Sequence, residues 1–294
     1  MDIEVPRGKY VLAVSGGVDS MVLLNLLSNL DGVKLVVAHF NHGIRTDSYL
    51  DEKLVSETAE QLGLAFEGRR AALGGKTGED AARRARYNFL EKVRQKHKAK
   101  AIITAHHQDD LIETALINLA RGTNRRGLTA ISDNPKIVRP LLSMPKTEIR
   151  QYAESNNLHW REDTTNQNTD YLRNHIRLIV LPGLSQKQRQ SLLLNLERLS
   201  TLNSEINSQI ATLSRLVFEK DRIDRQLFVQ LPDKIAREML VYWLRQGDFG
   251  EVDKREIERL NLALKTARAG TTHAVKGRTR VVVTDKSARF SSTP

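Results

Sequence analysis

Short apolar runs alternate with amphipathic segments over the first part of the chain. Apolar runs at Tyr10–Val14, Lys34–Phe40 and Leu64–Arg70 predict β-strands. The segments that follow the first two, among them Tyr49–Leu62, have the apolar spacing of helices. Strands that alternate with helices in this way predict a parallel sheet with crossover helices.

The same alternation continues for two more strands. Ala99–Ala105 and Ile137–Leu142 predict the fourth and fifth strands, and Pro140 closes the fifth. Helices are expected from near Gly78, from near His107 to Leu119, and over Pro145–Asn156, with a basic glycine loop at Leu119–Gly127. We therefore expect residues 1–183 to form a doubly wound, mostly parallel five-stranded α/β domain.

The pattern changes after Pro182. Gln186–Phe218 is almost free of glycine and proline, which predicts a long connecting helix, placed at residues 184–220. Ile235–Leu244 and Arg255–Leu264 predict two more helices, and Val275–Phe290 alternates like a β-hairpin. Residues 221–294 are thus expected to form a small, mainly helical α+β domain. The apolar stripe predicted for the long helix is Leu192, Leu193, Leu196, Leu199, Leu202, Ile206 and Ile210.

Charge points to an anionic partner, with nucleic acid the first candidate. The 294 residues carry a net charge of +11, and residues 201–294 hold 17 Lys and Arg against 12 Asp and Glu. The C-terminal domain is therefore either a packing appendage or a substrate-docking module. The sequence contains no cysteine, which excludes disulfides, thiolate zinc sites and iron–sulfur clusters in it. No apolar run is long enough to span a membrane, and we expect a cytoplasmic protein.

The polar stretch after the first strand has the features of a phosphate-binding loop. It reads SGGVDS, and its two glycines permit close backbone approach to an anion, while the helix that follows contributes free N–H groups. It lacks the lysine of the GxxxxGK[ST] loop, and Asp19 stands in the loop instead. An aspartate beside polyphosphate suggests a bridging Mg²⁺. The alternative is an ordinary strand-to-helix turn.

A second polar cluster, HHQDD, follows the fourth strand. If a helix begins near His107, then His106, Asp110 and Glu113 lie near one face and could converge on one site. Three interpretations compete: helix capping by acidic residues, a His/Asp metal centre whose further ligands are not evident, and a catalytic acid/base set that faces ATP.

The sequence of motifs resembles the tRNA(Ile)-lysidine synthetases, a subgroup of the PP-loop ATP pyrophosphatases. SGGVDS, HFNHGIR, GEDAARRARYNFL, TAHHQDDLIET, LARGT, RPLL, WREDTTN and RNHIR follow one another over roughly residues 10–180. The resemblance implies that ATP adenylates C2 of the wobble cytidine in an isoleucine tRNA with a CAU anticodon. The amine of free lysine then displaces AMP.

The resemblance also implies roles for individual residues. Catalytic roles are expected for Asp110 as base or ammonium anchor, and for Arg86 and His106 beside the α-phosphate. The residues expected to bind ATP or pyrophosphate are Ser15, Gly16, Gly17, Val18, Asp19, Ser20, His39, Asn41 and His42, with Mg²⁺ held through Asp19. The residues expected to contact tRNA or substrate are Arg45, Arg121, Arg173, Arg177, Arg278 and Arg280.

One departure from the family, one further implied partner and two alternatives accompany this interpretation. The sequence ends soon after residue 290, so we expect a short form with one C-terminal module, and tRNA discrimination borrowed from longer relatives is in doubt. Family members often dimerise, which makes a homodimer a further implied partner that the sequence itself leaves open. One alternative is a non-catalytic tRNA- or nucleotide-binding protein on the same scaffold. The other is a tRNA thiolase of the superfamily, which the absence of cysteine disfavours.

Overall fold

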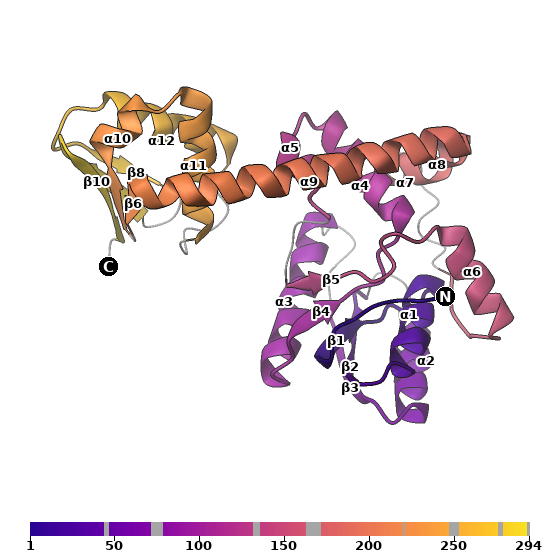
Figure 1. The fold of residues 1–294 in the computed structure, drawn as a ribbon. Helices are drawn as coiled ribbons and strands as arrows, with labels where there is room; N and C mark the ends of the chain where they lie inside the picture. The colour runs from indigo at the N-terminus through magenta and orange to yellow at the C-terminus, as the bar shows by residue number, and fades with distance from the viewer. Residues whose placement is uncertain are drawn as a thin grey trace. The chain divides into compact units, whose positions relative to one another are not determined.

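The computed structural model describes two compact units. It describes residues 1–43, 47–71, 79–131, 136–162, 172–219, 221–246, 253–275 and 279–292. The units are Met1–Ser200 and Thr201–Pro294, and their boundary falls within the long helix (Figure 1). The long helix is thus divided between the two units. The predicted domain limits at residues 183 and 220, with a separate connecting helix between them, stay a prediction.

The first unit is built on a five-stranded parallel sheet in the order β3-β2-β1-β4-β5. In register, Tyr10 of β1 faces Leu35 of β2 on one side and Ala101 of β4 on the other. The predicted doubly wound α/β class is confirmed. The strands are β1 (Gly8–Ala13), β2 (Val33–Asn41), β3 (Ala65–Arg70), β4 (Ala101–Ile103) and β5 (Ile137–Val138).

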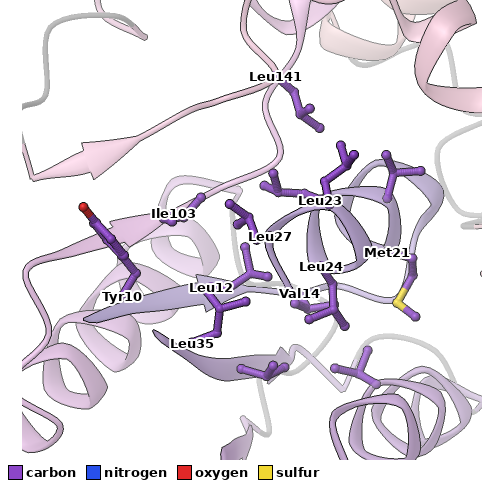
Figure 2. Close-up of a cluster of buried hydrophobic side chains, with 14 of the residues drawn as sticks. Tyr10, Leu12, Val14, Met21, Leu23, Leu24, Leu27, Leu35, Ile103 and Leu141 are labelled. Carbon is purple, nitrogen blue, oxygen red and sulfur yellow. The ribbon is translucent and has the colours of Figure 1, made fainter. Parts of the chain in front are cut away.

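Helices cover both faces of this sheet, because successive side chains of a strand point to opposite faces. On β1, Leu12 packs with α1, α2 and α6, whereas Val11 packs with α3. Figure 2 shows the first of these clusters, in which Leu23, Leu24 and Leu27 of one helix meet the strands. The helices of the first unit are α1 (Val18–Ser28), α2 (Ser48–Gln61), α3 (Glu79–Lys96), α4 (Gln108–Ala120), α5 (Arg125–Leu128), α6 (Lys146–Ser155), α7 (Leu172–His175) and α8 (Leu181–Gly183), with a π-helical turn at Ile176–Val180.

Two local predictions for this unit were wrong in part. The fifth strand is shorter than predicted, because only Ile137 and Val138 pair with β4. The segment predicted as a basic glycine loop contains the short helix α5, in which Arg126 is buried.

The helix α9 (Gln186–Val217) contributes to the cores of both units. Leu192 and Leu193 pack against Ile117 of α4, and Ile210 and Val217 belong to the core of the second unit. One predicted member of its apolar stripe was misplaced: Leu202 is 52% exposed.

The second unit combines helices with an antiparallel sheet in the order β6-β7-β10-β9-β8. The predicted hairpin is confirmed as β9 and β10, where Phe290 pairs with Val281. Phe228, Met239 and Leu240 are fully buried in its core. Its elements are β6 (Phe218–Glu219), β7 (Arg222–Asp224), α10 (Arg225–Gln230), α11 (Asp233–Gln246), α12 (Lys254–Thr266), β8 (Thr272–Ala274), β9 (Thr279–Val283) and β10 (Ser287–Ser292).

No helix in the described parts of the chain is both long and apolar enough to cross a membrane.

Candidate functional site

A cavity lies where the order of the strands reverses. The chain runs outward from β1 through β2 to β3 and then returns to the other side of β1 with β4. In parallel sheets, ligands bind at the carboxyl ends of strands at such a switch point. The cavity has a volume of about 360 Å³. It is lined by Ala13, Val14, Ser15, Gly17, Asp19, Ser20, Ala38, Phe40, His42, Arg86, Leu90, Thr104, Ala105 and His106.

The loop after β1 is held by its own two serines. The Ser15 N–H donates to Ser20 Oγ at 3.2 Å, and that hydroxyl donates to the Gly17 carbonyl at 2.8 Å. Gly16 has φ of +93°, a conformation that side chains disfavour. Ser15 and Ser20, which are predicted to bind pyrophosphate, thus also fix the conformation of the loop.

The helix that leaves this loop has an uncapped N-terminus. Gly17 is the N-cap residue of α1, and no side chain caps that end. Free N–H groups and the helix dipole make such an end suitable for an anion. The helix α4 differs, because His107 and Asp110 form a capping box at its start. Of these two helix starts, that of α1 is the one without a side-chain cap.

His107 joins the two polar motifs. Its Nε2 lies 3.6 Å from Asp19 Oδ2 and 3.4 Å from Asp110 Oδ2, and its Nδ1 accepts from the Asp109 N–H at 3.2 Å. Burial alone would lower the pKa of His107, but the hydrogen bond to Asp19 and the charge of Asp110 raise it above its ordinary value. His107 was absent from the predicted site, although its place in HHQDD was visible.

The Asp19 carboxylate faces the cavity with one oxygen unused. Asp19 Oδ1 is buried and has no hydrogen-bond partner among the described residues. Burial would raise the pKa of Asp19, yet the hydrogen bond and charge of His107, with Lys146 and Arg177, bring it below the usual value. The group is thus a carboxylate with a free acceptor oxygen at the cavity wall.

His106 also lines the cavity. Its Nδ1 lies 2.8 Å from Thr104 Oγ1. Burial lowers the pKa of His106 to about 4; the charge of Asp110 opposes this, and the charges of Arg139, Arg86 and Arg83 add to it. The imidazole is therefore neutral near pH 7 and can exchange hydrogen bonds with a ligand without carrying charge.

Glu113 is buried beneath the second motif and binds two predicted RNA-contacting arginines. Arg177 Nε donates to Glu113 Oε2 at 2.9 Å, and Arg173 Nε lies 2.7 Å from Glu113 Oε1. Arg177 Nη2 also reaches Asp110 Oδ1 at 3.4 Å. Arg177 lies in the π-helical turn, a geometry that is frequent at functional sites. In this structure both arginines have carboxylate partners inside the protein.

Arg161 ties the phosphate loop to α2. Its backbone N–H donates to the Gly16 carbonyl at 3.0 Å. Its guanidinium contacts Asp51 Oδ1 at 2.7 Å and Asp47 Oδ2 at 2.6 Å. A Cβ on Gly16 would lie 3.3 Å from the Asp51 Cβ. The sequence showed Arg161 inside WREDTTN, but the spacing of more than 100 residues to Asp51 gave no signal of the contact.

The structure brings only part of the predicted set to the cavity. Ser15, Gly17, Asp19, Ser20, His42, Arg86 and His106 line it, whereas Gly16, Val18, His39, Asn41 and Asp110 do not. His39 Nδ1 bonds to the Val14 carbonyl at 2.8 Å, and the Asn41 side chain bonds to Gly43 N and Ser48 O. Arg121 and Arg280 are exposed, and Arg45 and Arg278 lie outside the described residues.

Of the two aspartates in HHQDD that could cap a helix, Asp110 does so and Asp109 does not. Asp110 Oδ2 accepts from the His107 N–H at 3.0 Å, while Asp109 Oδ1 binds Arg189 Nη1 at 2.5 Å. In the portion of the chain that the structure describes, no three His, Asp or Glu side chains gather as metal ligands. These residues give no support to a His/Asp metal centre.

The fold and the loop together define the class of protein. A family model described as a PP-loop domain matches residues 3–184, and the chain belongs to that family. Among curated relatives, it is 34% identical over 276 residues to a tRNA(Ile)-lysidine synthase of Streptococcus sanguinis, covering 91% of this chain and 62% of that protein. It is 43% identical over 189 residues to the protein of the same name from Thermus thermophilus, covering 62% of this chain and 37% of the relative. The chain thus spans less than two thirds of the length of these relatives.

A solved structure shares the fold. A U34-tRNA thiolase, NcsA, from Methanococcus maripaludis, with its [4Fe-4S] cluster, aligns with a TM-score of 0.55 at 18% identity. The alignment covers 66% of this chain and 73% of that one, and at this identity it is evidence for the fold alone.

Proposed function

We propose that this chain is a tRNA(Ile)-lysidine synthase. The O2 atom of the wobble cytidine attacks the α-phosphorus of ATP, and pyrophosphate leaves. An amine of free L-lysine then attacks C2, and AMP leaves with the former O2. The products are lysidine in the tRNA, AMP and pyrophosphate.

The observation that carries the proposal is one cavity with two chemically different walls. One wall is the loop Ser15–Ser20 with the open N-terminus of α1, which suits pyrophosphate. The other holds Arg86 and the neutral His106, and Asp110 of α4 is near enough for its charge to affect the pKa of both. The two curated relatives, whose alignments cover 91% and 62% of this chain, are both named tRNA(Ile)-lysidine synthase, which supports the choice of substrates.

Each wall has a role in the two steps. Arg86 supplies positive charge at the α-phosphate while negative charge builds up in the first transition state. Asp110 accepts a proton from the lysine ammonium, or anchors it, because an amine attacks only when deprotonated. Arg177 Nη2 lies 3.4 Å from Asp110 Oδ1 and holds that carboxylate in position.

Mg²⁺ fits the site through Asp19. This carboxylate has a buried oxygen without a partner and lies on the cavity wall beside the phosphate loop. Mg²⁺ is commonly held by one or two carboxylates together with substrate phosphates. When bound, the ion would neutralise charge on the phosphates. Asp19 is the residue that we propose as its protein ligand.

Recognition of tRNA by the second unit remains part of the proposal, as does a homodimer. Arg280 on β9 is exposed, as docking to a phosphate backbone requires. A cytoplasmic location fits an enzyme that acts on tRNA.

Pyrophosphate release tests the proposed function. Wild-type protein should release pyrophosphate from ATP only when tRNA(Ile) with a CAU anticodon is present, and should place labelled lysine in that tRNA. Asp19→Asn should lower this rate by about 100-fold or more, since the loop loses its only acidic group. Asp31→Asn, at an exposed position after α1, is the matched control and should keep full rate.

The two alternatives give different results in the same assay. A non-catalytic binder would bind tRNA and ATP without releasing pyrophosphate. A thiolase would release pyrophosphate without incorporating lysine; the absence of cysteine from this sequence leaves no cluster ligand for chemistry of that kind.

A further inference from the structure

Three arginines gather at the edge of the sheet where the cavity opens. Arg83 and Arg86 lie in the N-terminal part of α3, and Arg139 directly follows β5. Because α3 runs back between parallel strands, its N-terminal end and the carboxyl end of β5 lie at the same edge of the sheet. Arg86 lines the cavity, whereas Arg83 and Arg139 do not.

Two of these guanidiniums lie over the ring of Tyr87. The Cζ atoms of Arg83 and Arg86 lie 5.1 Å and 5.3 Å from the centre of its ring, within cation–π range. Arg139 lies near this pair, because burial and the charge of Arg83 together lower its pKa, and the Tyr87 hydroxyl is buried without a hydrogen-bond partner among the described residues. All three charges reach His106, whose pKa they help to lower. We refer to Arg83, Arg86 and Arg139 as the arginine cluster.

Among the described side chains, no ion pair balances the charge of the arginine cluster. Other arginines of this unit are paired: Arg161 with Asp51, and Arg177 with Glu113. Within the described ranges, no member of the arginine cluster forms such an ion pair, and the buried Nε of Arg139 has no hydrogen-bond partner. Asp110 attracts Arg86, but its oxygens are bonded to Arg177 and to the His107 N–H. Like charges held close together without a counter-ion favour an anionic ligand.

We propose that the arginine cluster, through Arg83 and Arg139, binds a backbone phosphate of the RNA strand whose base enters the cavity. The proposal rests on the proposed function and adds a binding site to it. The ATP phosphates already have the loop, the open end of α1 and Arg86, which lines the cavity. Arg83 is exposed and Arg139 is half-buried, so these two extend positive charge outward from the cavity. A planar guanidinium matches a phosphodiester in geometry and in charge.

RNA binding by full-length variants tests the cluster. The probe is a fluorescent RNA hairpin with the anticodon arm of tRNA(Ile), and its anisotropy is measured at several salt concentrations, with ATP affinity measured separately by calorimetry. Arg83→Ala and Arg139→Ala should each raise the Kd for RNA by about 3- to 10-fold and flatten the slope of log K against log salt by about 0.7 per lost contact. ATP affinity should change less than about two-fold.

Arg84→Ala is the matched control. Arg84 is exposed, adjoins Arg83, and has no contact with Tyr87 among the described residues. It should leave the Kd for RNA nearly unchanged. Because Arg139 is half-buried, its variant is checked by thermal unfolding, and the exposed Arg83 gives an independent test.

Three outcomes would overturn the proposal: a loss of ATP affinity with RNA binding unchanged, an equal loss in Arg84→Ala, or no change in Arg83→Ala. The proposed function fails separately. If wild-type protein incorporates no lysine while Arg83→Ala still weakens RNA binding, the function is wrong and the cluster stands.

Discussion

The two units have different interiors. The first unit buries charged and polar side chains such as His39, Asp51, His107 and Glu113 beside its parallel sheet. In the second unit, the buried polar side chains among the described residues are Asn203, Ser214 and Asn261, within a core of residues such as Phe228 and Met239. Burying a charge is costly unless it is paired. The first unit thus bears the desolvation cost of buried polar and charged groups around its cavity. In the second unit, the described core is mainly apolar and the charged side chains lie at the surface.

This difference has a structural origin. In the first unit, parallel strands end at one edge, so the segments after β1 and β4 converge and bring Asp19 within reach of His107. In the second unit, antiparallel strands place their turns at both ends of the sheet, which spreads the connecting segments apart. The buried polar groups should therefore control chemistry, and the apolar core of the second unit should control stability.

The largest effect is expected from Asp110→Asn. The amide oxygen can still accept from the His107 N–H, so the start of α4 should be kept, but the charge that faces Arg177 and His107 is lost. Lysine incorporation should fall by at least about 100-fold, the usual range for a lost acid or base. Binding of tRNA should stay within about two-fold. Full activity of this variant would remove Asp110 from the mechanism.

Phe228→Ala should separate stability from chemistry. Phe228 is fully buried in the second unit, and its truncation should reduce the free energy of unfolding by about 3–5 kcal/mol. ATP affinity should be kept, because the cavity residues all lie in the first unit. Denaturant unfolding and calorimetry provide the measurements, with the exposed neighbour change Val229→Ala as control. A large drop in ATP affinity would contradict the division of roles.

Arg161→Ala should affect both properties of the first unit. It leaves the buried Asp51, which packs beside Gly16, without its guanidinium partner, while the hydrogen bond from the backbone N–H of residue 161 to the Gly16 carbonyl is kept. We expect a loss of about 1–3 kcal/mol of stability, since Arg161 is partly exposed. ATP affinity should weaken by roughly tenfold, with partial rescue in Arg161→Lys. Arg150→Ala, which removes exposed ion pairs only, is the control; if it has the same effect, Arg161 is not a positioning residue for the loop.

The smallest effect is a pH dependence from His106. Its pKa in the folded state is about 4, below the ordinary 6.5, so the unfolded chain binds more protons between these values. His106 therefore contributes stability that is present above about pH 6.5 and is lost as the pH falls toward 4. His106→Asn should flatten the change of unfolding free energy with pH in that window, whereas the exposed His159→Asn should not. A His106 resonance that titrates near pH 6.5 by NMR would contradict this.

Local patterns predicted much of the fold and half of the site. The alternation of apolar runs predicted β1 to β4 and the helices between them, because burial against a sheet imposes its period on the sequence. The segments β6, β7 and α10 were missed, since they are two to six residues long and carry little periodic signal. Leu202 matched the helical stripe but faces solvent, because the stripe passes from one core to the next at this part of α9.

By itself the sequence determined the α/β class, the loop Ser15–Ser20 and the HHQDD motif, because each depends on residues close together in the chain. Only the tertiary structure decided which side chains meet. Arg161 reaches Asp51 across 110 positions, and Glu113 takes Arg173 and Arg177 as its partners. Arg139 comes to the same edge of the sheet as Arg83 and Arg86 because sheet order brings β5 beside β4 and α3 returns to that edge. Such contacts depend on strand order and side-chain packing, which no local pattern specifies.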